Sequence, residues 1–382
     1  MDVPTSSNAD LRSLALSITA IYVIFNLRLT GGFVPTPSSV MSVERIREAL
    51  SKVQDPDLHK DLISLDFIRD IRIMGRDVSF TIQLTTPACP LKDKLREDSE
   101  NAIRGLIPDV GKIQIGFDAR MRADRRIMEK LKLPIKAIVA VGSGKGGVGK
   151  STVAVNLAVG LAQSGAAVGL LDADIYGPNI PTLMGVQQLP PPQKEKIVPA
   201  RAHGVLLMSM GFLVSETEAL VWRGPMIHGA LQQLFSEVVW GELDYLIVDL
   251  PPGTGDAQLS VAQLVPLTGG VVVTTPQLLA VSDARRGVTA FKKLSVPVLG
   301  IVENMAGDVF GQGGGEKAAE EMQVPFLGRI PMDPIVTRMG DAGTPPVTLE
   351  GSNGSGGALR SLAKAVAARV SVMQFQNDGD GR

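Results

Sequence analysis

The sequence predicts an α/β protein in which a doubly wound, mainly parallel sheet is preceded by a smaller α+β domain. The main observation is a series of short apolar runs after residue 136, among them AIVAV, YLIVD and VLGIVEN, which alternate with helical stretches. Near-continuous apolar runs are typical of parallel strands buried on both faces. The second observation is a separate pattern before residue 119, where helix, strand, strand, helix and strand (αββαβ) form a complete unit.

Length and composition limit the possible classes of protein. A chain of 382 residues is long enough for about two domains, and its 45% apolar and 20% charged residues are typical of globular proteins. The formal charge of −1 gives no general reason to expect a nucleic acid partner. One cysteine and three scattered histidines fit a reducing cytoplasm. We therefore expect a cytoplasmic protein with no nucleic acid partner and no firm membrane association.

The first 40 residues do not fit this description. Residues 13–27 form an uncharged, mostly apolar run, which is shorter than the ~20 residues that a membrane helix needs. Asp2 and Asp10 outnumber Arg12 before the run, whereas a secretory signal begins with a basic segment. Two interpretations stay open: a leader that is untranslated or disordered, with Met41 opening the protein, or an anchor.

The domain boundaries follow from changes in composition. Residues 119–136 carry seven Lys or Arg against Asp124 and Glu129, which favours a solvated linker over a binding site for an anionic partner. A last helix from Leu359 to about Met373 has one apolar face, which we expect to dock on the sheet rather than on a membrane. The predicted units are 1–40 (leader), 41–118 (α+β domain), 119–136 (basic linker), 137–373 (main α/β domain) and 374–382 (disordered tail).

A glycine-rich loop directly after the strand AIVAV carries the clearest chemical signal. Residues 144–151 match G-x-x-x-x-G-K-[ST] between a strand and a helix, which is the context that a phosphate-binding P-loop requires. The backbone N–H groups of such a loop surround phosphate oxygens, and the helix N-terminus adds partial positive charge. We expect Lys150 to reach the β- and γ-phosphates and Ser151 to bind Mg²⁺. The predicted ATP-binding residues are Gly144, Lys145, Gly146, Gly147, Val148, Gly149, Lys150, Ser151 and Thr152.

Acidic and amide side chains follow the neighbouring strands. Asp249 ends the run YLIVD as a Walker B carboxylate and is expected to hold Mg²⁺ through water. Asp172 and Asp174 follow VGLL, and Asp172 is expected to support the Mg²⁺ shell. The loop from Pro251 to Asp256 is stiff and glycine-hinged, as segments that respond to a γ-phosphate are.

The second lysine of the loop, Lys145, resembles the deviant P-loop of the MinD, ParA and nitrogenase-reductase superfamily. That resemblance implies a homodimer in which Lys145 reaches the partner's nucleotide. It also implies that Asp174 orients the attacking water, so the predicted catalytic residues are Lys145, Lys150 and Asp174. Asn304, at the end of VLGIVEN, occupies the position where related ATPases contact the adenine; a turn asparagine is the alternative.

Longer stretches resemble the Mrp/ApbC iron–sulfur cluster carrier ATPases over about residues 41–372. These stretches are VWRGPM at 221–226, DADIYGPN at 172–179 and WGELDYLIVDLPPGTGD at 240–256. The front unit, with TTPACP at 85–90, resembles an iron–sulfur assembly domain. The resemblance implies ATP-controlled transfer of a [4Fe–4S] cluster, with iron–sulfur scaffold or client apoproteins as partners.

The chain departs from that family where members carry Cys-x-x-Cys after the Glu-Asn-Met segment, because no cysteine follows Met305 here. Cys89 is the only thiol, and it precedes a predicted helix whose first turn holds Lys92 and Lys94. Both features are expected to lower its pKa and favour the thiolate that ligates iron. The alternative for Cys89 is a small buried hydrophobe. For the whole chain the alternatives are a MinD/ParA-like positioning ATPase and a cluster-free ATPase scaffold.

Overall fold

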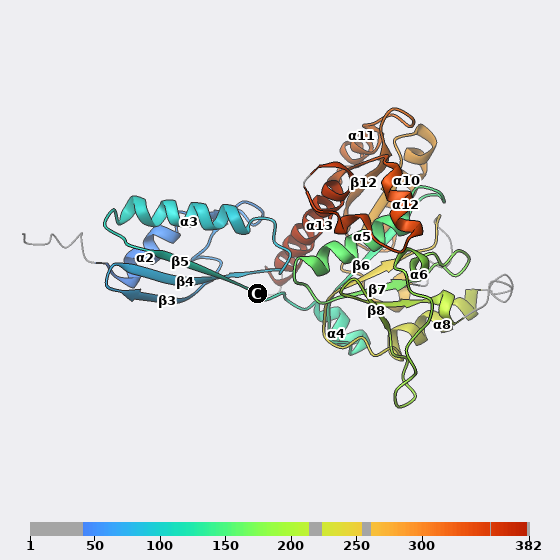
Figure 1. Cartoon of the computed structure of the whole chain (residues 1–382), viewed down its shortest axis with the longest axis horizontal. Coiled ribbons are helices and arrows are strands. Elements are labelled where there is room, and N and C mark those ends of the chain that lie inside the picture. The colour runs from blue at the N-terminus through green and yellow to red at the C-terminus, as the bar shows by residue number, and fades with distance from the viewer. Residues whose placement is uncertain (1–40, 214–223, 254–260, 352, 380–382) are drawn as a thin grey trace, which may run out of the picture.

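The computed structural model describes residues 41–213, 224–253, 261–351 and 353–379 (Figure 1). The leader lies outside these ranges, as do parts of two stretches singled out above, residues 221–223 and 254–256. No helix of the described ranges is long and apolar enough to cross a membrane.

The front domain has the predicted αββαβ order. Two helices cover one three-stranded sheet of order β3-β4-β5, in which β3 and β4 are antiparallel and β4 and β5 are parallel. A short β1-β2 pair, which the sequence did not suggest, is inserted after the first helix. The elements are α2 (Val43–Leu50), β1 (Gln54–Asp55), β2 (Lys60–Asp61), β3 (Ile68–Met74), β4 (Asp77–Leu84), α3 (Lys92–Leu106) and β5 (Ile113–Ala119).

Local chemistry explains these elements. Ser42 caps α2 by accepting a hydrogen bond from the N–H of Arg45. Alternate residues of β4 are buried, as expected for a strand with one face on a core. The turn between β3 and β4 places Gly75 at φ +63°, a conformation that favours glycine.

The second domain is a doubly wound α/β sheet, as predicted. Its eight strands have the order β13-β12-β11-β6-β10-β7-β9-β8, and the pairings are parallel except between β8 and β9. The strands are β6 (Ile135–Ser143), β7 (Val168–Asp172), β8 (Ala200–Ala202), β9 (Val205–Ser209), β10 (Leu243–Asp249), β11 (Gly269–Thr274), β12 (Val298–Ala306) and β13 (Phe326–Pro331). The helices are α4 (Arg125–Leu131), α5 (Lys150–Gln163), α6 (Ile180–Leu183), α8 (Gly224–Ser236), α10 (Leu278–Lys293), α11 (Gly314–Glu321), α12 (Pro334–Asp341) and α13 (Gly354–Gly379), with single 3₁₀ turns η2 (Met210–Phe212) and η3 (Pro346–Thr348).

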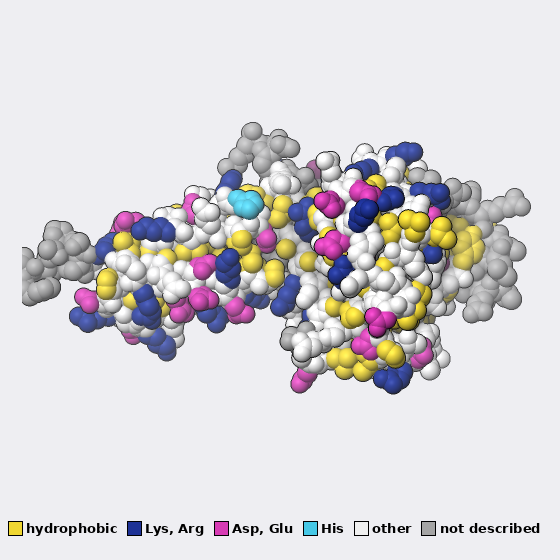
Figure 2. Space-filling model, turned by 90° about the horizontal axis from the view of Figure 1, so that it is seen from above, with side chains coloured by type: hydrophobic (Ala, Val, Ile, Leu, Met, Phe, Trp, Pro, Cys, Tyr) yellow, Lys and Arg dark blue, Asp and Glu magenta, His cyan; other side chains and the backbone are white. Residues whose placement is uncertain are grey.

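Both faces of this sheet are covered by helices, which explains the unbroken apolar runs. On β6, Val139 and Val141 belong to the core shared with α5 and α13, whereas Ile138 and Ala140 belong to the opposite core with α8 and α10. All four side chains are fully buried. On the face shown in Figure 2, basic and acidic side chains are interspersed, in keeping with the net charge of −1.

The predicted basic linker at 119–136 is not a simple linker. It contains helix α4, which Asp124 caps by accepting a hydrogen bond from the N–H of Arg126. Ile127 is fully buried in the second-domain core. Ile127 packs this segment against the second domain, which the many charged residues of the segment did not indicate.

The final helix also differs from its predicted extent. α13 begins at Gly354 and continues to Gly379, past residue 373, where we placed the start of a disordered tail. The reason is packing at the domain junction: Gln374 donates to the carbonyl of Lys136 at 3.1 Å, and Phe375 packs against the front-domain core. Its apolar face docks on the second domain, as predicted, through Leu359, Leu362, Val366 and Val370.

Candidate nucleotide-binding site

The glycine-rich loop joins β6 to α5 at the carboxyl edge of the sheet. Gly147 and Gly149 both adopt φ +81°, and Gly149 immediately precedes α5. A Cβ on Gly144 would lie 2.0 Å from the carbonyl oxygen of Asp283, and one on Gly149 would lie 2.3 Å from Nδ2 of Asn304. Only glycine fits these two positions, so the loop keeps the narrow curve that exposes backbone N–H groups.

Lys150 begins α5 and points toward the strand-end carboxylates. Its Nζ lies 2.8 Å from Oδ1 of Asp249 and 3.8 Å from Oδ2 of Asp174, and its side chain is 6% exposed. Asp249 ends β10, beside the end of β6, where the main chain pairs Asp249 with Val141. The parallel sheet thus brings together residues that are about 100 positions apart in the chain.

Three hydrogen bonds hold the Asp172 carboxylate in place. It is fully buried, and its carboxylate accepts hydrogen bonds from the N–H of Asp174, the N–H of Ile180 and the hydroxyl of Ser209. The Ser209 contact was missed by sequence reasoning. Its only sequence signal is that Ser209 ends the apolar run VLLMS, and the pairing of β7 with β9 supplies the rest.

The site carries an imbalance of charge. Burial, and then the Asp249 carboxylate, raise the pKa of Asp172 to about 8. Burial also raises the pKa of Asp174 and of Asp249, and Lys150 opposes both shifts. Oδ2 of Asp249 is buried without a hydrogen-bond donor from the described residues. Oδ2 of Asp249 and the neighbouring Ser151 hydroxyl are hard oxygen ligands of the kind that fits a divalent cation such as Mg²⁺.

Two other predicted residues lie at the loop. Nδ2 of Asn304 donates to the carbonyl of Val148 at 2.9 Å, so this side chain braces the loop. The carbonyl of Lys145 accepts a hydrogen bond from the Ser143 hydroxyl, and within the described ranges the ion pairs of the site involve Lys150 and not Lys145. The predicted contacts of Asn304 with adenine and of Lys145 with a second subunit stay predictions.

The segment where the family's Cys-x-x-Cys is expected forms a tight turn after β12. Gly307 and Gly311 exchange backbone hydrogen bonds of 2.9 and 2.7 Å. Glu303 anchors the end of the turn by accepting from the N–H of Gly313 and from Nε of Arg329. Val309 is 71% exposed in this turn. The turn therefore lies at the same edge of the sheet as the nucleotide loop but contains no cysteine.

Cys89 lies elsewhere, at the junction of the two domains. Three residues before it, the Thr86 hydroxyl lies 2.7 Å from the hydroxyl of Tyr245, which is fully buried near the start of β10. Tyr245 precedes Asp249 by four residues on β10, or ~13 Å along the strand.

The predicted lowering of the pKa of Cys89 is wrong. Burial raises the pKa of this thiol to about 11. A hydrogen bond from the backbone N–H of Leu91 opposes the rise, the carboxylates of Asp55 and Asp57 add to it, and Lys92 opposes it least. Among the described residues no group of three or more His, Cys, Asp or Glu side chains is arranged to hold a metal ion.

A phosphate-binding loop between β6 and α5, with a buried lysine above strand-end carboxylates, defines the class of the protein as a P-loop NTPase. Residues 134–367 match the family model described as a NUBPL iron-transfer P-loop NTPase, and residues 43–115 match the model of an iron–sulfur cluster assembly protein. The chain belongs to the iron–sulfur cluster carrier family of P-loop NTPases. This assignment confirms the resemblance seen in the sequence and supports a cluster carrier or assembly factor over a positioning ATPase.

Individual relatives agree with the family. The chain is 48% identical over 350 residues to an iron–sulfur cluster carrier protein of Synechocystis sp., which covers 87% of this chain and 99% of that protein. It is 48% identical over 342 residues to a protein of the same name from Deinococcus radiodurans, covering 86% and 96%.

Among solved structures, a nucleotide-binding protein from Archaeoglobus fulgidus in complex with ADP is 39% identical, with a TM-score of 0.50 over 58% of this chain and 91% of that one. The cell division ATPase MinD of Pyrococcus furiosus, at 24% identity and a TM-score of 0.51, covers 60% of this chain and 98% of its own. This second likeness concerns the fold alone.

Proposed function

We propose that this chain binds Mg-ATP at residues 144–152 as a homodimer, hydrolyses it, and uses the cycle to pass an iron–sulfur cluster from a scaffold to client apoproteins. The observation that carries the nucleotide part is the position of Lys150. Its Nζ lies 2.8 Å from Asp249 and 3.8 Å from Asp174, directly below a loop shaped for phosphate. The family assignment carries the cluster part.

Each residue of the site has a separate role in binding or hydrolysing ATP under this proposal. ATP draws Nζ of Lys150 from the carboxylates to the β- and γ-phosphates, and Thr152 donates to the α-phosphate. Ser151, Asp249 and Asp172 would hold Mg²⁺, which would neutralise charge on the phosphate oxygens. Asp174 orients the attacking water, and Lys145 reaches the nucleotide of the second subunit. Asn304 keeps the loop in place and contacts the adenine.

The cluster is the cargo, and Cys89 is the ligand that the chain itself supplies. It lies in the domain that matches an assembly protein, and it is the only cysteine of the sequence. Iron binds the thiolate, whereas burial keeps the docked thiol protonated. We infer that loading accompanies release of the 85–90 loop from Tyr245. The thiol-free turn at 307–311 favours a second candidate, an ATPase scaffold whose partners supply all cluster ligands.

Single substitutions test the nucleotide assignment. Lys150→Ala is expected to abolish ATP binding and turnover. Asp174→Asn is expected to bind ATP but to hydrolyse it ~10²–10⁴-fold more slowly, because it loses the group that orients water. Asp341→Asn, an exposed carboxylate at the end of α12, serves as the matched control. Nucleotide binding by calorimetry and phosphate release give the two readouts; unchanged turnover in Lys150→Ala would refute the assignment.

A further inference from the structure

The carboxyl ends of four neighbouring strands form a row of residues next to the glycine-rich loop. The parallel register pairs Ser209 of β9 with Asp172 of β7. It then pairs Asp172 with Asp249 of β10, and Asp249 with Val141 of β6, the strand that leads into the loop. Ser209 is fully buried at the outer end of this row. It therefore contacts a residue of the candidate nucleotide site without belonging to the loop itself.

The Asp172 carboxylate closes the stretch of chain that contains Asp174. It accepts a hydrogen bond from the N–H of Asp174 at 3.1 Å and one from the N–H of Ile180 at 3.3 Å, so a single side chain is bonded to both ends of this stretch. Residues 173–179 belong to neither a helix nor a strand. These two bonds therefore take the place of the regular main-chain pairing that fixes a backbone elsewhere. The position of Asp174 depends on how the Asp172 carboxylate is oriented.

Ser209 fixes that orientation from a different strand. Its hydroxyl donates to Oδ2 of Asp172 at 2.9 Å and accepts from the N–H of Gly211 at 3.0 Å, so the hydroxyl acts as donor and acceptor at once. A Cβ on Gly211 would lie 3.0 Å from Cβ and Cγ of Pro178, which means that η2 also packs closely on residues 173–179. Hydrogen bonds to a carboxylate are among the stronger ones in proteins. The buried serine thus holds both the carboxylate and the segment that this carboxylate closes.

We propose that Ser209 is a positioning residue for ATP hydrolysis, because through Asp172 it places Asp174 where that carboxylate orients the attacking water. This inference rests on the proposed function, in which Asp174 has that role. Oδ2 of Asp174 lies 3.8 Å from Nζ of Lys150, beside the expected position of the phosphates. A misplacement of about 1 Å costs a reaction ~10²-fold in rate. Nucleotide affinity depends instead on the backbone of the glycine-rich loop.

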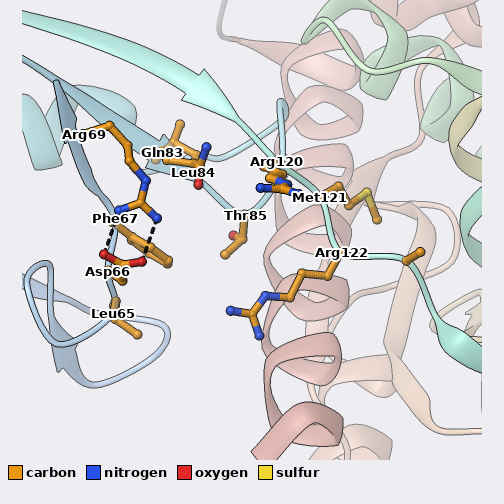
Figure 3. A pocket seen from close by; sticks show the side chains of 11 residues that line it. Leu65, Asp66, Phe67, Arg69, Gln83, Leu84, Thr85, Arg120, Met121 and Arg122 are labelled. Atoms are coloured by element: carbon orange, nitrogen blue, oxygen red, sulfur yellow. Dashed lines mark hydrogen bonds and ion pairs between the residues drawn. The ribbon is translucent and has the colours of Figure 1, made fainter.

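Steady-state ATP hydrolysis and calorimetric binding of ADP, both with the full chain at saturating Mg²⁺, test this role in Ser209→Ala. The matched control is Ser355→Ala. The buried Ser355 hydroxyl also contacts an aspartate, Oδ2 of Asp333 at 3.2 Å, but it lies beyond β13 at the opposite edge of the sheet. A second control, Ser371→Ala, removes a hydroxyl that donates to Thr85 at the domain junction, where Figure 3 shows Thr85 next to α13.

Ser209→Ala is expected to lower kcat by ~10–100-fold and to leave KM for ATP and the affinity for ADP within about twofold of the wild type, since only orientation is lost. Both controls are expected to keep the wild-type kcat. In hydrogen exchange followed by mass spectrometry, the amides of residues 174–180 are expected to exchange faster in Ser209→Ala alone.

A kcat of Ser209→Ala equal to that of the controls, or a raised KM with an unchanged kcat, overturns the inference. A wild type that does not turn over ATP refutes the proposed function instead. The two failures are therefore distinguishable. Amide exchange needs no ATP turnover, and equal exchange of residues 174–180 in Ser209→Ala and in the controls overturns the positioning role by itself.

Discussion

Lys150 and its carboxylates show how single residues prepare the site for a nucleotide. A buried lysine needs a partner, and Asp249 at 2.8 Å supplies one. Burial is the main cause of the raised pKa of Asp172, Asp174 and Asp249, and the single positive charge of Lys150 only partly opposes it. A divalent cation bound with ATP would lower these pKa values, because positive charge favours the ionised carboxylates.

Cys89 gives a prediction at the same scale. With a pKa of about 11, the folded thiol holds about 100-fold less thiolate at pH 8 than an ordinary cysteine with a pKa of 9.0. Alkylation by iodoacetamide at pH 8 is expected to be slower in the native chain by roughly that factor than in urea, where the ordinary pKa returns. The rates are followed by mass spectrometry.

The same shift fixes the sign of a stability effect. Because the pKa is higher in the folded state, the contribution of the protonated thiol to stability is fully present below about pH 9 and is lost as the pH rises through about 11. Cys89→Ser, with an uncharged side chain over this range, is expected to lose less stability between pH 9 and pH 11 than the wild type. Equal alkylation rates in the native and unfolded chains would contradict the raised pKa.

At the scale of elements, α4 shows that the basic segment is part of the second domain. Its cap Asp124 has a backbone N–H that donates to the carbonyl of Lys136, and its carboxylate accepts from the hydroxyl of Thr268 at 3.3 Å. Arg126 donates to the carbonyl of Leu267. These bonds attach the helix to the amino ends of β6 and β11.

Two adjacent positions of α4 test this attachment. Ile127→Ala is expected to lower the free energy of unfolding of the second domain by ~2–5 kcal/mol, because it leaves a cavity in a fully buried position. Met128→Ala, at a position that is 45% exposed, is the control and is expected to change stability by less than ~1 kcal/mol. Thermal and urea unfolding measure both; equal effects would mean that α4 is only a linker.

The limits of the sequence analysis lie between elements rather than within them. The P-loop and the buried strands were predictable because spacing along the chain determines them. Ser209 was missed because its contact with Asp172 arises from the pairing of β7 and β9. The pKa of Cys89 was predicted in the wrong direction because Lys92 and the helix N-terminus are local signals, whereas the burial that dominates comes from packing. The continuation of α13 past residue 373 likewise depends on contacts with the other domain.

For the whole molecule, the proposal requires that ATP join two copies of the chain. Analytical ultracentrifugation with ATP in the Asp174→Asn background, where hydrolysis is slow, is expected to show a dimer. Adding Lys145→Ala is expected to weaken the dimer at least about tenfold, since each subunit loses one charged contact to the partner's phosphate. Lys293→Ala, at the end of α10 and away from the nucleotide edge, is the control. An unchanged dimer with Lys145→Ala contradicts the role of this lysine.

The positions of the nucleotide site and of Cys89 bear on where a cluster would be bound. The nucleotide site and the thiol lie at opposite ends of β10, with Asp249 at one end and Tyr245, beside the Cys89 segment, near the other. The turn at 307–311, near the nucleotide, has no cysteine. Under the proposed function, the cluster ligand that this chain supplies is Cys89, at the domain junction.

Anaerobic reconstitution of the full chain with iron and sulfide tests this claim most directly. Bound iron and visible absorbance are measured for the wild type and for Cys89→Ala side by side. The account predicts a cluster that forms on the wild type and is lost in Cys89→Ala. Equal iron in both chains, or no cluster on the wild type, would contradict it and leave an ATPase whose partners supply every ligand of the cluster.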